Sequence, residues 1–110
     1  MSSFHAHTVA VDAAARVIRL VAAVPPRLRE LDDQATRAAA RVPLSLAEGA
    51  GRRGRDREHH WRIAYGSARE AASAVELLVA LGAVDAEQGR EALAALDRVG
   101  AMTWRALHPR

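Results

Sequence analysis

Hydrophobic side chains recur at spacings of three and four residues in four successive segments of the chain. Such spacing places apolar residues on one face of an α-helix, and the segments cover roughly residues 8–24, 28–49, 56–81 and 85–108. No run alternates between apolar and polar residues with a period of two over a useful length, so we predict no β-strand. The pattern predicts an all-α protein.

Prolines and polar residues mark the limits of the first helix. Residues 1–7 are polar and are predicted to form a frayed tail, with Thr8 as the N-cap of the helix. Pro25 and Pro26 end this helix, because the residue before a proline is driven out of the helical region. The second helix is therefore predicted to start just after them, near Arg27 or Leu28.

The second helix has a proline inside its apolar pattern. Pro43 lacks a backbone donor and its ring crowds the carbonyl four residues earlier, so we predict a kink near Ala39 to Val42. The near-heptad seam is typical of left-handed bundle packing and runs through Leu28, Leu31, Ala35, Ala38, Val42, Leu46 and Gly49. Glycines are predicted to end the helix, at Gly49, Gly51 and Gly54.

The third and fourth helices carry seams of the same kind. We predict Asp56 and Asp85 as their N-caps and Gly82 as the end of the third helix. The predicted third seam contains Trp61, Tyr65, Ala68, Ala72, Val75 and Val79. The predicted fourth seam contains Leu93, Leu96, Gly100, Thr103 and Leu107.

Four amphipathic helices with short connections predict an antiparallel up-and-down four-helix bundle, with the second helix kinked at a proline. A chain of 110 residues, half of them hydrophobic, suits one domain over residues 1–110. A core rich in alanine buries less apolar area than a leucine core, which favours burial between subunits. Trp104, on a flank of the fourth helix, is either an ordinary boundary residue or part of a subunit interface.

Composition narrows the classes of function. There is no cysteine, so we expect neither disulfides nor a thiolate metal site. No apolar run approaches 18 residues and no leader pattern is present, so we expect a cytoplasmic protein without a membrane span. His59 and His60 are adjacent and would point about 100° apart on a helix, which disfavours a metal site, and we expect no cofactor.

All 16 basic residues are arginine, and the formal net charge is +3. Arginines gather after the second helix, and the candidate nucleic-acid-binding residues are Arg52, Arg53, Arg55 and Arg57, with Arg37 and Arg41 earlier. One interpretation is a patch that contacts phosphates. The other is a solvated loop whose arginines pair with Asp56 and Glu58. No aromatic residue is interleaved to stack on bases except Trp61, which fits the core seam better.

Glu48 and Glu70 are the carboxylates of most interest, with Arg37 and Arg69 as possible partners. Two carboxylates can divide the work of acid and base in hydrolysis. The interpretation that we favour is a structural network at a helix crossing, because no nucleophile accompanies them. We therefore expect a protein that is not an enzyme.

Several short motifs resemble the signature of the 23S rRNA-intervening-sequence proteins. These motifs are Gln34, Arg37-Ala38-Ala39, Val42-Pro43-Leu44, Leu46-Ala47-Glu48-Gly49, Gly51-Arg52, Ile63-Ala64, Gly66-Ser67 and Glu70, with Pro43, Glu48, Gly49, Gly51, Gly66 and Glu70 as structural signature positions. The chain departs from the signature at Arg41 and Ser45.

The resemblance implies a four-helix bundle that assembles as a homopentamer. It also implies similarity to the accessory variability protein of diversity-generating retroelements, a basic pentamer that binds nucleic acid and a reverse transcriptase. With the arginine pattern, the expected function is self-association and binding of RNA or DNA without strong sequence preference. The alternative is a protein-interaction scaffold or retroelement accessory protein with no affinity for nucleic acid.

Overall fold

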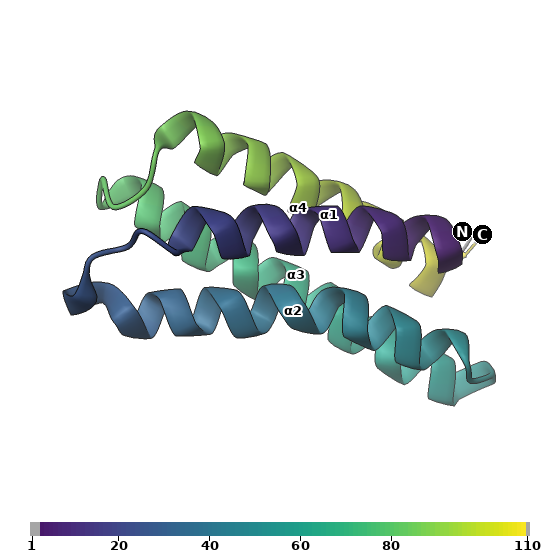
Figure 1. Ribbon diagram of the computed structural model, residues 1–110. Helices are drawn as coiled ribbons and strands as arrows, with labels where there is room; N and C mark the ends of the chain where they lie inside the picture. The colour runs from purple at the N-terminus through teal and green to yellow at the C-terminus, as the bar shows by residue number, and fades with distance from the viewer. Residues whose placement is uncertain (1–2, 110) are drawn as a thin grey trace.

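The computed structural model describes residues 3–109 as a bundle of α-helices (Figure 1). Its elements are α1 (Ser3–Val21), a 3-10 helix η1 (Pro26–Leu28), α2 (Arg29–Ala50), α3 (Gly54–Ala80) and α4 (Ala86–Leu107). Over this range there is no strand, and no helix is long and apolar enough to cross a membrane. The predicted all-α four-helix fold is confirmed.

Each helix packs against the next in sequence, and α4 returns to pack against α1. The bundle is elongated, with principal extents of 43 × 21 × 18 Å. Both ends of the chain and the turn between α2 and α3 lie at one end of the bundle, and η1 lies at the other (Figure 1). The antiparallel order therefore brings residues from the first, middle and last parts of the chain to a common end.

The core consists of two clusters along this long axis. The cluster nearer η1 is centred on Val17, Val75 and Leu78. The cluster nearer the α2–α3 turn contains Ala6, Val9, Ala10, Val42, Leu46, Ala64, Ala68 and Val99, with Trp61 and Met102 packed against it. Alanine fills many of the fully buried positions, so adjacent helix axes approach closely.

The start of α1 corrects the sequence-based prediction. The helix already includes Ser3, so Thr8 is not its N-cap, and residues 3–7 are helical rather than a frayed tail. Ala6 is completely buried in the core cluster nearer the α2–α3 turn. This packing stabilises helical structure on the N-terminal side of Thr8, where the sequence had predicted the helix to start. Residues 1 and 2 lie outside the described range.

The two predicted N-caps at aspartates have different outcomes. Asp85 is confirmed, since its Oδ2 accepts a hydrogen bond of 2.8 Å from the backbone N–H of Gln88. Asp56 is wrong as a cap, because α3 begins earlier, after Arg53, and Asp56 lies in its first turn. Gly54 makes that early start possible with a φ of +56°, a conformation that side chains disfavour.

The buried line of α3 is displaced from the predicted seam. Ala68 and Val75 are buried as expected, whereas the predicted Trp61, Tyr65, Ala72 and Val79 are only half-buried. The buried residues of α3 are Ala64, Ser67, Ala68, Ala71, Val75 and Leu78. Most of the buried residues are small, and the aromatic rings of Trp61 and Tyr65 lie beside this buried line.

Pro43 lies inside α2, which continues to Ala50. The proline removes the donor that would otherwise bond to the carbonyl of Ala39, and packing of the flanking Val42 and Leu46 in the core maintains the helix through it. The proline is thus internal to the helix, as predicted. The kink stays a prediction.

Candidate nucleic-acid interface

The α2–α3 turn presents several arginines at the end of the bundle. Gly51 caps the C-terminus of α2, and Gly54 turns the chain directly into α3. Only residues 51–53 separate the two helices. This short connection leaves Arg52, Arg53 and Arg55 exposed on one compact segment.

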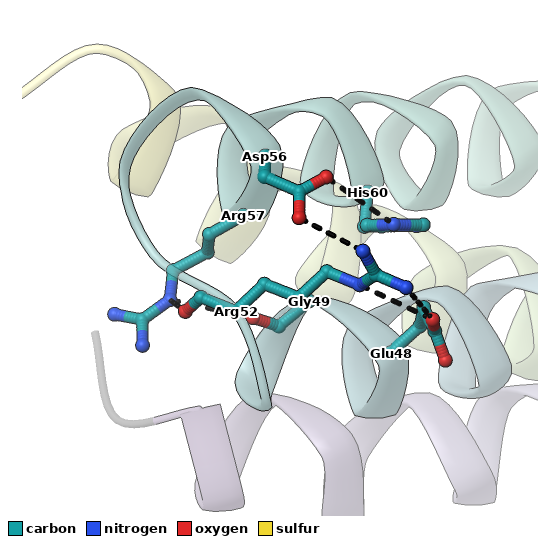
Figure 2. A network of polar contacts seen from close by, with 6 residues as sticks. All are labelled: Glu48, Gly49, Arg52, Asp56, Arg57 and His60. Atoms are coloured by element: carbon teal, nitrogen blue, oxygen red, sulfur yellow. Dashed lines mark hydrogen bonds and ion pairs between the residues drawn. The ribbon is translucent and has the colours of Figure 1, made fainter.

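Arg52 lies between two carboxylates (Figure 2). Its Nε donates to Oε1 of Glu48 at 3.2 Å, and its Nη1 donates to Oδ2 of Asp56 at 2.8 Å. His60 approaches the other oxygen of Asp56, with 4.0 Å between Nε2 and Oδ1. The network joins the last turn of α2 to the first turns of α3.

Electrostatics within this network keep all three groups charged. Hydrogen bonds from Arg52 lower the pKa of the Glu48 carboxyl and the pKa of the Asp56 carboxyl. The same bonds, first from Asp56 and then from Glu48, raise the pKa of the Arg52 guanidinium. Arg52 is therefore compensated by two carboxylates and is a poor candidate for a phosphate contact.

Arg57 also has a structural role. Its Nε donates to the carbonyl oxygens of Arg52 at 2.8 Å and Gly49 at 3.3 Å (Figure 2). Its guanidinium carbon lies 5.7 Å from the ring centre of Trp61, a cation–π geometry. Arg57 therefore bonds one carbonyl in the last turn of α2 and one in the connection that follows, which closes the helix terminus.

Arg53 and Arg55 differ from these two residues. Both are exposed, and neither makes an ion pair with another residue of the described range. They flank Gly54, where the chain enters α3. Among the four arginines at residues 52–57, these two are the side chains for which the described structure shows no polar partner.

The earlier arginines lie away from the turn. Arg41 forms a bridge of 3.7 Å between its Nη2 and Oε1 of Glu70 on α3. Arg41 precedes Glu48 by seven residues on α2, which is roughly 10 Å along the helix. Arg37 is one turn further and exposed. The predicted set of six arginines is therefore not one patch.

Glu48 and Glu70 are not brought together. Glu48 pairs with Arg52, and Glu70 pairs with Arg41. The two pairs are separated by the seven residues of α2 between Arg41 and Glu48, roughly 10 Å. The predicted partnership of Glu48 with Arg37 is wrong. Arg52 lies four residues after Glu48 and pairs with it, whereas Arg37 lies eleven residues before Glu48 on α2, roughly 16 Å away along the helix. A hollow of about 350 Å³ between α3 and α4 includes neither glutamate and is lined by residues such as Arg69, Glu76 and Asp97.

The signature glycines have different surroundings. Gly49 is buried against Trp61, and Gly51 is the exposed C-cap of α2. Gly66 is exposed, and a Cβ added there would meet nothing within 4 Å. Sequence reasoning missed Gly89, where a Cβ would lie 2.5 Å from Cγ2 of Val79, so that this glycine permits close packing of α4 on α3.

A second missed feature is a pair of stacked rings near the end of α4. The rings of Trp104 and His108 have centroids 4.1 Å apart and planes inclined by 20°. Their spacing of four residues on a helix was a signal that could have revealed the contact. In residues 3–109, no group of three or more metal-ligating side chains is placed to hold a metal ion.

Positive charge is concentrated at the end with the α2–α3 turn. The half of the bundle that contains this turn consists of residues 3–12, 40–67 and 97–109. These residues include 8 arginines and 5 carboxylates. In residues 13–39 and 68–96, the numbers are 7 and 8. All five histidines also lie in the first group. The modest net charge therefore conceals an asymmetry along the bundle axis.

Comparison with protein families identifies a match over most of the chain. The model of the family described as 23S rRNA-intervening sequence protein matches residues 4–105, nearly the whole chain. A search of curated proteins found no significant match. The chain belongs to the 23S rRNA-intervening sequence protein family.

Proposed function

We propose that this protein is a non-enzymatic bundle that binds the phosphate backbone of RNA or DNA through the end carrying the α2–α3 turn. The observation that carries the proposal is the pair Arg53 and Arg55, exposed and uncompensated on a turn with a glycine between them. Guanidinium groups suit bidentate phosphate contacts, and absence of a base-reading element predicts little sequence preference.

The surroundings of the two arginines support this assignment. Arg52 and Arg57 hold the turn through their bonds to α2 and α3, so Arg53 and Arg55 project from a rigid segment. No side chain caps the start of α3, whose dipole adds positive potential at this point. Gly54 has no side chain that would keep a phosphate away from the backbone.

A salt titration of labelled RNA and labelled duplex DNA tests the proposal. The slope of log affinity against log salt should be about −0.9 per neutralised phosphate on duplex DNA and about −0.7 on single strands. Replacing Arg53 and Arg55 by alanine should weaken binding and flatten the slope. The matched control replaces Arg27 and Arg29, which are exposed at the other end, and should leave the slope unchanged. No binding of the unmodified protein at about 50 mM salt would contradict the proposal.

We further infer that copies of the chain associate through an apolar face of α1 and α2. Val11 and Ile18 are 47% and 38% exposed on α1, one turn either side of Ala15, and Leu44 is 67% exposed on α2. Ala40, Pro43 and Ala47 continue the α2 stripe at helical spacing. Such a contiguous uncharged surface is typical of an interface.

Two ion pairs locate these stripes. Arg16 pairs with Glu91 of α4, so it marks the side of α1 that faces α4. Arg41 pairs with Glu70 of α3, so it marks the side of α2 that faces α3. The apolar stripes lie on the other side of each helix. The stripes therefore border the junction of α1 with α2.

The resemblance of the signature motifs makes five subunits the expected assembly. Light scattering should show an oligomer, and Ile18→Glu should convert it to monomer, because a charge would be buried at the interface. The control Leu81→Glu adds the same charge at an exposed position outside this face. A folded monomer as the native state would contradict self-association.

The same apolar face favours one alternative function. A protein partner, such as a reverse transcriptase, could occupy it in place of another copy, and the protein would then act as a scaffold without affinity for nucleic acid. That outcome is indicated if the native protein is monomeric and fails the salt titration, yet Ile18→Glu abolishes capture of the partner.

A further inference from the structure

An aromatic surface is exposed near the C-terminal end of α4. Trp104, one of the two tryptophans in the chain, is 47% exposed to solvent. The imidazole of His108 stacks on its indole at 4.1 Å, and Nδ1 of His108 donates to the carbonyl oxygen of Trp104 at 2.9 Å. The stack and the hydrogen bond hold both rings in a defined orientation.

The C-terminal end of α4, which carries the stack, lies at the same end of the bundle as the α2–α3 turn (Figure 1). Ala68 and Gly100 line one hollow between α3 and α4, so in antiparallel packing Trp104 lies level with Ala64. Arg55 is nine residues before Ala64, roughly 14 Å along α3. Arg105, next to Trp104, is exposed and makes no ion pair within the described part of the chain.

We propose that the Trp104–His108 stack is a nucleobase-stacking site, which makes single-stranded nucleic acid the preferred ligand. This inference rests on the proposed function, in which Arg53 and Arg55 contact the phosphates. An unpaired base stacks on an exposed aromatic ring regardless of its identity, and nearby cations hold the backbone. In a duplex the bases are already stacked on one another, so the site discriminates against duplexes.

The surroundings of Trp104 favour a nucleobase over another copy of the chain. Its neighbour Arg105 is exposed and charged, and the exposed Asp97 lies two turns earlier on the same face of α4. An interface core is depleted in charge. The uncharged face that suits self-association lies on α1 and α2, away from this position.

Affinity for two oligonucleotides of equal charge tests the base contact. The probes are a single-stranded oligothymidylate and an abasic oligonucleotide of the same length, measured by anisotropy at low salt. Trp104→Leu keeps an apolar side chain without the large π surface and should weaken binding of oligothymidylate by about 5- to 150-fold. Trp104→Phe should recover part of the loss. The abasic probe should bind the native protein as weakly as oligothymidylate binds Trp104→Leu.

Fluorescence provides a readout at the ring itself. In Trp61→Phe only Trp104 emits, and oligothymidylate should quench this emission whereas the abasic probe and a duplex should not. Trp61→Phe should fold, because it removes a buried Nε1 donor that has no acceptor in the described structure. Trp104→Phe, in which only Trp61 emits, supplies the converse measurement and should show little quenching.

Three outcomes would overturn the inference. Equal affinity of the native protein for the abasic and thymidine probes leaves phosphate binding intact and removes the base contact. Trp104 emission that changes on dilution without nucleic acid, together with dissociation of Trp104→Leu into monomers, assigns the ring to an interface between copies. Failure of every probe to bind at low salt rejects the stacking site and the proposed function together.

Discussion

Gly49 of α2 lies directly against the indole ring of Trp61 in α3. A Cβ at position 49 would be 3.0 Å from Cδ1 and 3.1 Å from Nε1 of Trp61. The carbonyl of Gly49 accepts a hydrogen bond from Arg57, whose guanidinium lies over the same indole. The absent side chain at position 49 thus allows α2 and α3 to converge next to the turn that carries the candidate site.

Alanine at position 49 should destabilise the protein, whereas alanine at position 66 should stabilise it. Gly66 is exposed within α3 and has no neighbour for a new Cβ, so Gly66→Ala should add about 1 kcal/mol of helix propensity. Gly49→Ala gains the same propensity but crowds Trp61, which costs about 1–3 kcal/mol. Urea denaturation of both variants measures the difference. Equal stabilisation by both would show that the indole moves aside freely.

Arg57→Ala should lower the free energy of unfolding by about 1–2 kcal/mol, because the carbonyl of Arg52 loses its side-chain donor and the carbonyl of Gly49 keeps only backbone donors. Arg55→Ala removes the same charge two residues earlier from an exposed side chain and serves as the control, with an expected change near zero. Thermal melting distinguishes the two. Identical melting temperatures would place Arg57 among the free surface cations.

The stabilisation that Arg52 provides should depend on pH. The pKa values of Glu48 and Asp56 are lowered in the folded protein, so both carboxyls bind protons more readily when the chain is unfolded. Their contribution is therefore fully present above the ordinary carboxyl pKa and is lost as the pH falls through the lower folded values. Arg52→Ala should melt below the native protein at pH 7, and the difference should disappear in acid. Arg53→Ala should show no such change with pH.

Pro43→Ala should raise the free energy of unfolding by about 1–3 kcal/mol. The substitution restores an N–H group for the carbonyl of Ala39 and removes the clash of the ring, although the unfolded chain gains some freedom. Denaturation in urea, with light scattering on the same samples, checks both stability and assembly. A less stable variant would show that packing of the half-buried proline outweighs the helix-breaking effect.

Features governed by neighbouring residues could be predicted well from the sequence. Asp85 caps α4 because the acceptor and the Gln88 donor are three residues apart. Asp56 failed as a cap because its carboxylate is engaged by Arg52 across the turn and Gly54 lets α3 begin earlier. At Thr8, a sound local start signal was overridden by burial of Ala6 among three other helices.

The amino-acid sequence by itself determined the number of helices, their amphipathic faces, and the presence of an arginine-rich turn, because these follow from backbone periodicity and the chemistry of adjacent residues. The tertiary structure decided which arginines are free. Packing of α3 against α2 engages Arg52 and Arg57 and leaves Arg53 and Arg55 uncompensated. It also brought the C-terminal end of α4, which carries Trp104, to the same end of the bundle, since the positions of residues distant in the chain depend on how the helices pack and not on local spacing.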